Sequence, residues 1–313
     1  MTALERTYRN GRIAIGGTVV LIGIAVVVTS ARGGVLGSIS AYYYTPARNV
    51  LVGSLLAAAV AILVLSGRGA QRALLDAAAV VAPVIALVPT PVRAGAVPGV
   101  AVVCASGDRC LPEGVLPDVE VGVAVYLIAG ALTVGVVVVL AALGATRDRA
   151  AWLGADARGS AAGQGSARGA LVSAGVAAGV LAVVAAGWML ERDVFLASAH
   201  VVAAVVFFGL VAAVAVVNAV APPSGPGVPT APWLRRSYGV LAVALVIDLT
   251  VTVVAVLTGH ADDTAPPPLF VGEAVALALF VVFWVLQSVQ RWDDPDPAVR
   301  GSMPPLPRGR VQR

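Results

Sequence analysis

Eight long apolar runs, separated by short segments that carry the arginines, dominate this sequence. They cover residues 13–31, 49–67, 73–89, 121–146, 169–190, 194–221, 237–259 and 269–290. A helix of about 20 apolar residues crosses the hydrocarbon core of a bilayer. Only 12% of the 313 residues are charged, about half of what a soluble domain carries. We therefore expect an all-α fold, a polytopic transmembrane helical bundle with eight spans. Pro83 and Pro89 make the span over 73–89 the least regular of them.

The arginines predict the orientation of this bundle. The chain has no lysine, and sixteen of its 21 arginines fall at the two termini or in alternate connections. Because cytoplasmic segments collect basic residues, this distribution indicates that both termini are cytoplasmic. It also explains the net charge of +4, so we do not expect a nucleic-acid partner. We interpret the first run as an uncleaved span; the alternative is a cleaved signal peptide, whose apolar core is usually shorter.

Four parts follow from this topology. Residues 1–146 hold the first four spans with an extracytoplasmic Cys-containing loop, 147–168 a cytoplasmic flexible loop, 169–291 the last four spans, and 292–313 a disordered cytoplasmic tail. The two cysteines of the chain, Cys104 and Cys110, lie on the expected outer side, where disulfides persist. We expect them to form one, with two free thiols as the alternative. No metal site is expected there, because no histidine is near.

The stretch SISAYYYTPARN, residues 38–49, concentrates polar and aromatic groups before the second span. Tyrosines of this kind can simply anchor a protein at the membrane interface. A contiguous block instead favours a lid-like element over the outer mouth of the bundle. Arg48 can pair with Glu273 or bind a lipid phosphate. The candidate ligand-binding residues in this block are Ser38, Ser40, Tyr42, Tyr43, Tyr44 and Arg48.

Three ionisable residues interrupt the later spans. An ionisable side chain inside a membrane usually faces the bundle interior or a water-filled cavity. His200 and Glu273 fall near the outer ends of their spans, and Asp248 lies near the middle of 237–259. The topology therefore brings His200 and Glu273 to one level, with Asp248 below them. The alternative interpretation of Asp248 is a neutral, buried group that only hydrogen-bonds a neighbouring helix, or a carboxylate paired with an arginine.

Several of these segments resemble segments of other membrane proteins. SISAYYYTPARNVLVG, ALVPT, AHVVAAVVFF and FVGEAVALALFVVFWVLQ resemble segments of a group of uncharacterised bacterial multi-pass inner-membrane proteins. The resemblance implies a helical bundle in the bacterial plasma (inner) membrane and no particular activity. This chain differs from that group at Asn49, where the group carries Asp.

Four functions fit these patterns. We favour a membrane protein that binds a lipid headgroup or small ligand in an outward-facing polar pocket, with membrane lipids as partners and no cofactor or metal. A proton-coupled transporter using Asp248 and an intramembrane lipid hydrolase are the alternatives. The hydrolase is disfavoured because the chain has two histidines, which excludes a three-histidine zinc site. In a structural role, Gly175 and Gly179 permit close helix packing, more readily within the bundle than between subunits. The sequence allows a homo-oligomer or a complex with other membrane subunits and does not favour either.

Overall fold

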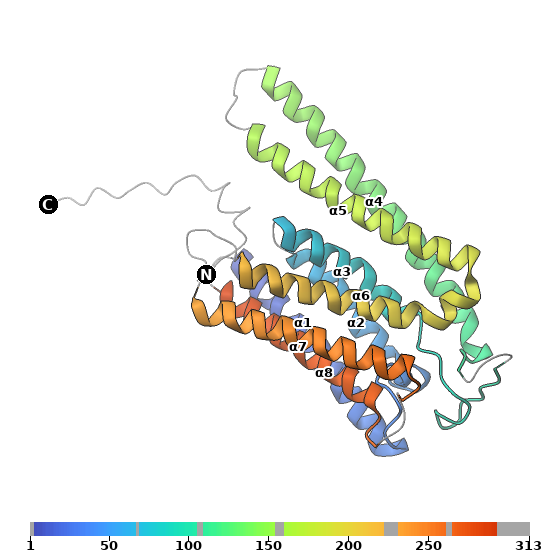
Figure 1. Cartoon of the computed structure of the whole chain (residues 1–313). Coiled ribbons are helices and arrows are strands. Elements are labelled where there is room, and N and C mark those ends of the chain that lie inside the picture. Colours follow the sequence, from blue (N-terminus) through green and yellow to red (C-terminus); the bar gives the residue numbers. More distant parts are fainter. Residues whose placement is uncertain are drawn as a thin grey trace.

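A computed structural model describes residues 3–66, 69–104, 109–153, 160–221, 231–260 and 265–292. Within these ranges the chain is a bundle of long helices without β-strands, and two short 3₁₀ helices lie in its connections (Figure 1). The long helices are α1 (Ala3–Gly33), α2 (Arg48–Leu65), α3 (Gly69–Leu87), α4 (Leu116–Leu153), α5 (Ser160–Leu190), α6 (Arg192–Val220), α7 (Pro232–Leu257) and α8 (Pro268–Gln290). The 3₁₀ helices are η1 (Ser40–Tyr44) and η2 (Glu113–Val115).

All eight long helices of the described chain are long and apolar enough to cross a membrane. Their outer faces carry large apolar side chains, such as Val125, Leu132 and Leu140 of α4, which are 58%, 66% and 62% exposed. A soluble protein rarely exposes an apolar surface of this extent. The predicted all-α bundle with eight candidate spans is therefore confirmed, and its orientation in the membrane stays a prediction.

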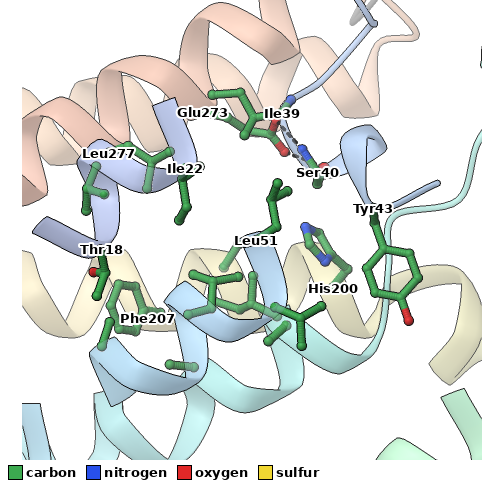
Figure 2. A pocket seen from close by; sticks show the side chains of 18 of the residues that line it. Thr18, Ile22, Ile39, Ser40, Tyr43, Leu51, His200, Phe207, Glu273 and Leu277 are labelled. Carbon is green, nitrogen blue, oxygen red and sulfur yellow. Dashed lines mark hydrogen bonds between the residues drawn. The ribbon is translucent and has the colours of Figure 1, made fainter. Parts of the chain in front are cut away.

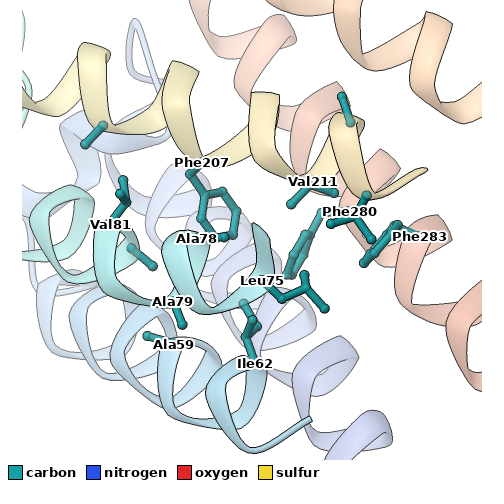
Figure 3. Packing of buried hydrophobic residues seen from close by; sticks show 14 of the residues in the cluster. Ala59, Ile62, Leu75, Ala78, Ala79, Val81, Phe207, Val211, Phe280 and Phe283 are labelled. Carbon is teal, nitrogen blue, oxygen red and sulfur yellow. The ribbon is translucent and has the colours of Figure 1, made fainter. Parts of the chain in front are cut away.

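Helix α3 lies at the centre of the bundle, in contact with α2, α5 and α6. It is the most buried of the candidate spans and also the least apolar. Its run of alanines, including Ala78 and Ala79, lets the neighbouring backbones approach closely, as in other membrane bundles. Figure 3 shows these alanines and Leu75 against Ile62 of α2 and Phe283 of α8. The helix continues through Pro83 and ends before Pro89.

The first and last helices meet at one end of the bundle, here called the arginine-rich end. Arg12 Nη1 of α1 donates to the Arg291 carbonyl at 2.6 Å, directly after α8. Arg291 donates to Gln71 Oε1 at 3.2 Å, and Gln71 contacts Gln287 of α8. These groups are largely buried, so they join α1, α3 and α8 through mutual hydrogen bonds where lipid supplies none.

The α4–α5 hairpin packs along the outside of α3 and extends beyond the other helices (Figure 1). It changes one predicted boundary, because residues 147–153 continue α4 and residues 160–168 begin α5. Arg, Ala, Leu and Gln are good helix formers, so the helices extend past the apolar runs. Residues 154–159 of the expected loop and 293–313 of the expected tail lie outside the described residues.

Helices α4 and α5 approach each other closely at Gly130, which is not one of the two glycines predicted to mediate packing. A methyl group at Gly130 would lie 2.6 Å from Leu181 Cδ2, whereas a methyl at Gly175 or Gly179 would have no neighbour within 4 Å. The Gly175-x-x-x-Gly179 pair therefore does not mediate packing within the bundle. Its spacing is correct for close helix contact, but the helix turns this face away from α4.

Candidate functional site

A short 3₁₀ helix and its flanks close the end of the bundle opposite the arginine-rich end. We call residues 38–47 the tyrosine cap. The Ser38 hydroxyl accepts the Ala41 N–H at 3.0 Å, which satisfies a donor in the first turn of η1 as serine caps do. The Thr45 hydroxyl donates to the Tyr42 carbonyl at 2.7 Å and accepts the Ala47 N–H at 3.2 Å. Short polar side chains therefore terminate η1 on both sides and lead directly into α2.

Two of the three tyrosines hold the cap in place. The fully buried Tyr42 hydroxyl hydrogen-bonds to the Ser30 hydroxyl of α1 and accepts the Leu36 N–H at 3.2 Å. The Tyr44 hydroxyl donates to the Thr90 carbonyl at 2.7 Å. Burial raises the pKa of the Tyr44 phenol, so the donor stays protonated. These two predicted ligand-binding residues thus bind other parts of the chain.

The loop under Tyr44 forms a second fixed element at this end. Val92 and Cys110 exchange backbone hydrogen bonds of 3.1 Å in each direction. Cys104 and Cys110 form a disulfide with Cα atoms 5.6 Å apart. Val92 and Val97 pack with Tyr42 in a small core separate from that of the bundle. The loop and the cap therefore support each other.

Glu273 of α8 attaches the cap to the bundle. Its Oε2 accepts the N–H groups of Ile39 and Ser40, the latter at 3.1 Å. Its Oε1 accepts the Ser40 hydroxyl at 2.6 Å. Figure 2 shows this contact at the upper rim of a cavity. A carboxylate is suited to this position, because it can accept several hydrogen bonds through both oxygens.

Arg48 lies elsewhere than predicted. Its guanidinium donates to Asp118 Oδ2 at 2.8 Å and to the Tyr43 hydroxyl at 2.7 Å, and it stacks over the Tyr43 ring. The predicted pairing of Arg48 with Glu273 is therefore wrong. The cause is geometric, since Arg48 begins α2 beside the start of α4, while Glu273 faces the other side of the cap. Burial raises the pKa of Tyr43, although Arg48 opposes this shift.

A cavity of about 110 Å³ lies directly beneath the cap, between α1, α2, α3, α6 and α8. Most of its polar residues gather at one end, where Ser40, Tyr43, His200 and Glu273 line it, while Thr18 lies at the other end (Figure 2). Apolar side chains surround the rest. They include Ile22, Leu55, Ala58, Phe207 and Leu277. Figure 2 shows the His200 ring beside the cavity below Ser40, with the Tyr43 hydroxyl turned outward. We call this space the cap cavity.

His200 is fixed by the end of α3. Its Nδ1 lies 2.8 Å from the Val88 carbonyl oxygen, and because a carbonyl can only accept, Nδ1 carries the proton. The last carbonyls of a helix lack partners within the helix, so the histidine satisfies one of them. The side chain is buried, at 7% exposure, and still reaches the cavity wall.

A second, smaller cavity of about 60 Å³ adjoins the first and lies between α6, α7 and α8. We call it the side cavity. His200, Ala204, Phe208 and Glu273 line both spaces, so the two cavities have a common wall. Asp248 of α7 lines the side cavity only. The side chains of His200, Glu273 and Asp248, which belong to three different spans, are thus gathered around one region.

The remaining candidate, Ser38, lines a shallow pocket of about 330 Å³ beside the cap, together with Arg93 and Arg109. Tyr42, Tyr44 and Arg48 line none of these three spaces. The residues that sequence reasoning missed are mainly the apolar walls and Thr18 of α1. A single threonine in an apolar run carries no signal that would have identified it.

No group of three His, Cys, Asp or Glu side chains in the described residues is placed to hold a metal ion. No family model, curated protein or solved structure matches the chain. The fold and the apolar outer faces define the class as a multi-pass membrane protein. The resemblance to bacterial inner-membrane proteins adds an expectation about the membrane in which it lies.

Proposed function

We propose that this protein binds a small amphiphilic molecule, such as a lipid headgroup with its adjoining apolar part, in the cap cavity. The observation that carries the proposal is that one cavity has its ionisable groups at the cap end and mostly apolar walls elsewhere. Ser40, His200 and Glu273 lie at the cap end, and the side chains of Ile22, Leu55 and Phe207 surround the remainder. Ligand sites commonly combine mostly apolar walls with a few convergent polar groups.

In this proposal the cap faces outward from a bacterial plasma membrane. The arginine distribution supports that orientation, because it puts the arginine-rich end in the cytoplasm. The disulfide between Cys104 and Cys110 supports it independently, since disulfides persist on the oxidising side of a membrane. A ligand would then reach the cavity from the outer leaflet or from the outer aqueous phase.

The test is to purify the protein in mild detergent and identify bound small molecules by native mass spectrometry. Ala58 of α2 is buried and lines the cavity, whereas Ala57 is exposed and does not line it. Ala58→Leu should fill space in the cavity and remove the bound mass, while Ala57→Leu should retain it. Ala204→Leu on α6 repeats the test from the other wall. A bound molecule that persists in both cavity-filling variants, or none in the parent protein, would contradict the proposal.

A proton-coupled transporter is the second candidate. The observation in its favour is that Asp248 lines a cavity that has a common wall with the cap cavity. A carboxylate inside a membrane is a typical proton carrier. Uptake of a candidate solute into proteoliposomes should then be lost in Asp248→Asn, and uptake that survives the change removes this function. Nothing in the described residues specifically favours the lipid hydrolase.

A further inference from the structure

The polar groups of the two cavities are matched to one kind of ligand. The Ser40 hydroxyl already donates to Glu273, and the Tyr43 hydroxyl lies with Arg48 outside the cavity. With Nδ1 protonated toward Val88, the other nitrogen of a neutral His200 ring is an acceptor. Glu273, whose carboxylate accepts hydrogen bonds from the cap, lines both cavities. The ionisable side chains in the walls therefore offer hydrogen-bond acceptors, beside the hydroxyl groups of Thr18, Thr90 and Thr252.

The side cavity adds a second carboxylate. Asp248 lines it, and this side chain makes no hydrogen bond or ion pair within the described part of the chain. A carboxylate inside a membrane span is normally paired. The missing partner indicates that a group from outside the chain, water or ligand, satisfies Asp248.

Positive side chains are turned away from both spaces. Among the described residues no arginine lines either cavity, and the chain contains no lysine. Arg48 pairs with Asp118 beyond the cap, while Arg93 and Arg109 line the shallow pocket beside it. An anionic group such as phosphate would thus find two carboxylates and no cation inside, which is strongly unfavourable at low dielectric.

We propose that the ligand of the cap cavity carries a protonated amine on an apolar body. The amine lies against Glu273 at the common wall, with Asp248 lining the side cavity beyond it, and the apolar body extends along Ile22, Leu55 and Phe207. This inference rests on the proposed function and specifies its ligand class. The cavities measure about 110 and 60 Å³, and a dry apolar cavity of about 150 Å³ accepts benzene. The cap cavity is smaller than that, so a short-chain amine fits it better than a ring does.

Three isosteric probes test the charge preference directly. Hexylamine, hexanol and hexanoate have similar apolar bodies and differ in the head group. Their binding to protein in phosphatidylcholine nanodiscs is measured by calorimetry, with empty nanodiscs subtracted. We expect hexylamine to bind most tightly, hexanol more weakly and hexanoate not detectably. Replacing part of the phosphatidylcholine by phosphatidylethanolamine distinguishes the amine source, because a lipid amine that occupies the site will compete with hexylamine.

Asp248→Asn is the matching variant, and Asp118→Asn is its control. Asp248→Asn keeps the side-chain shape and should weaken hexylamine binding about tenfold or more, because the attraction between the amine and a nearby second negative charge at low dielectric is lost. Hexanol binding should change less than about twofold. Asp118 is exposed and lines neither cavity, so Asp118→Asn should leave all three affinities unchanged.

The outcomes separate the two proposals. Hexanoate binding more tightly than hexylamine, or an amine preference that survives Asp248→Asn, overturns the ligand class while the cap cavity remains a binding site. Binding of none of the three probes, together with no co-purifying molecule, overturns the proposed function as well. Probe binding that persists unchanged in Ala58→Leu places the amine outside the cap cavity and also overturns the inference.

Discussion

Ser40 and Glu273 are 233 residues apart in the chain and are joined by two hydrogen bonds. The Ser40 N–H lies 3.1 Å from Oε2 of Glu273, and the Ser40 hydroxyl lies 2.6 Å from Oε1. This contact connects the tyrosine cap to the first turns of α8. Glu273 therefore has two roles in our interpretation, because it holds the cap closed and also lines the cavity beneath it.

Replacing Glu273 should loosen the cap in proportion to the acceptors that are lost. Glu273→Met leaves the Ile39 and Ser40 N–H groups without a partner, and each buried unpaired donor costs about 1–3 kcal/mol. Glu273→Gln keeps one carbonyl oxygen and should have a smaller effect. Hydrogen–deuterium exchange of residues 38–44 in nanodiscs measures the opening. Unchanged exchange in Glu273→Met would show that this contact does not hold the cap.

Gly272 should be required where α7 and α8 approach each other. A methyl group at this position would overlap the Thr252 hydroxyl and lie 3.2 Å from its Cβ. Gly272→Ala should lower the free energy of unfolding by about 1–3 kcal/mol, as overpacking does. Thr252→Ala in the same chain should restore part of it. Gly53→Ala is the control, because a methyl there has no neighbour within 4 Å; an equal loss in both glycine variants would contradict the prediction.

Tyr42→Phe should destabilise the protein more than Tyr44→Phe does. The Tyr42 hydroxyl is fully buried and has two partners, Ser30 and the Leu36 N–H, whereas the half-buried Tyr44 hydroxyl has one, the Thr90 carbonyl. We expect a loss of about 1–3 kcal/mol for Tyr42→Phe, measured by thermal unfolding in detergent. The reverse order of the two variants would show that Tyr42 does not hold the cap.

The disulfide should be measurable by labelling. Native protein should react with a maleimide at Cys104 and Cys110 only after reduction. Paired replacement by serine should cost about 2 kcal/mol of stability, as chain entropy predicts for a ring this short. The variant should keep the eight spans, because the ring stabilises only the loop packed on the cap. Labelling of both thiols without reductant would contradict the pairing.

The sequence was sufficient to predict the spans, because the length and apolarity of a transmembrane helix are constrained by the bilayer alone. The ends of the helices were predicted less well where good helix formers follow an apolar run. The predicted span over 121–146, for example, continues as helix α4 to Leu153. The prediction that His200 and Glu273 share one level followed from topology, and both residues do line the cap cavity.

The partners within the cap could not be predicted in the same way. Consecutive residues of a 3₁₀ helix point about 120° apart, so Tyr42, Tyr43 and Tyr44 face different neighbours despite their adjacency. The partner of Arg48 depends on the position of Asp118, which lies in the first turn of α4, 70 residues later in the chain. The cavity itself results from side-chain packing among five helices, which no local pattern in the sequence encodes.

The position of α8 has a consequence for biogenesis. This helix supplies Glu273 at the cap and the Gln287 and Arg291 contacts at the arginine-rich end, and it meets α1 there. During translation α1 is made first and α8 last. Until α8 has left the ribosome, the cap lacks its Glu273 anchor and the cavity lacks one wall, so we expect nascent chains and truncations ending before residue 268 not to hold the proposed ligand there. Capture of the proposed ligand would thus require synthesis through α8.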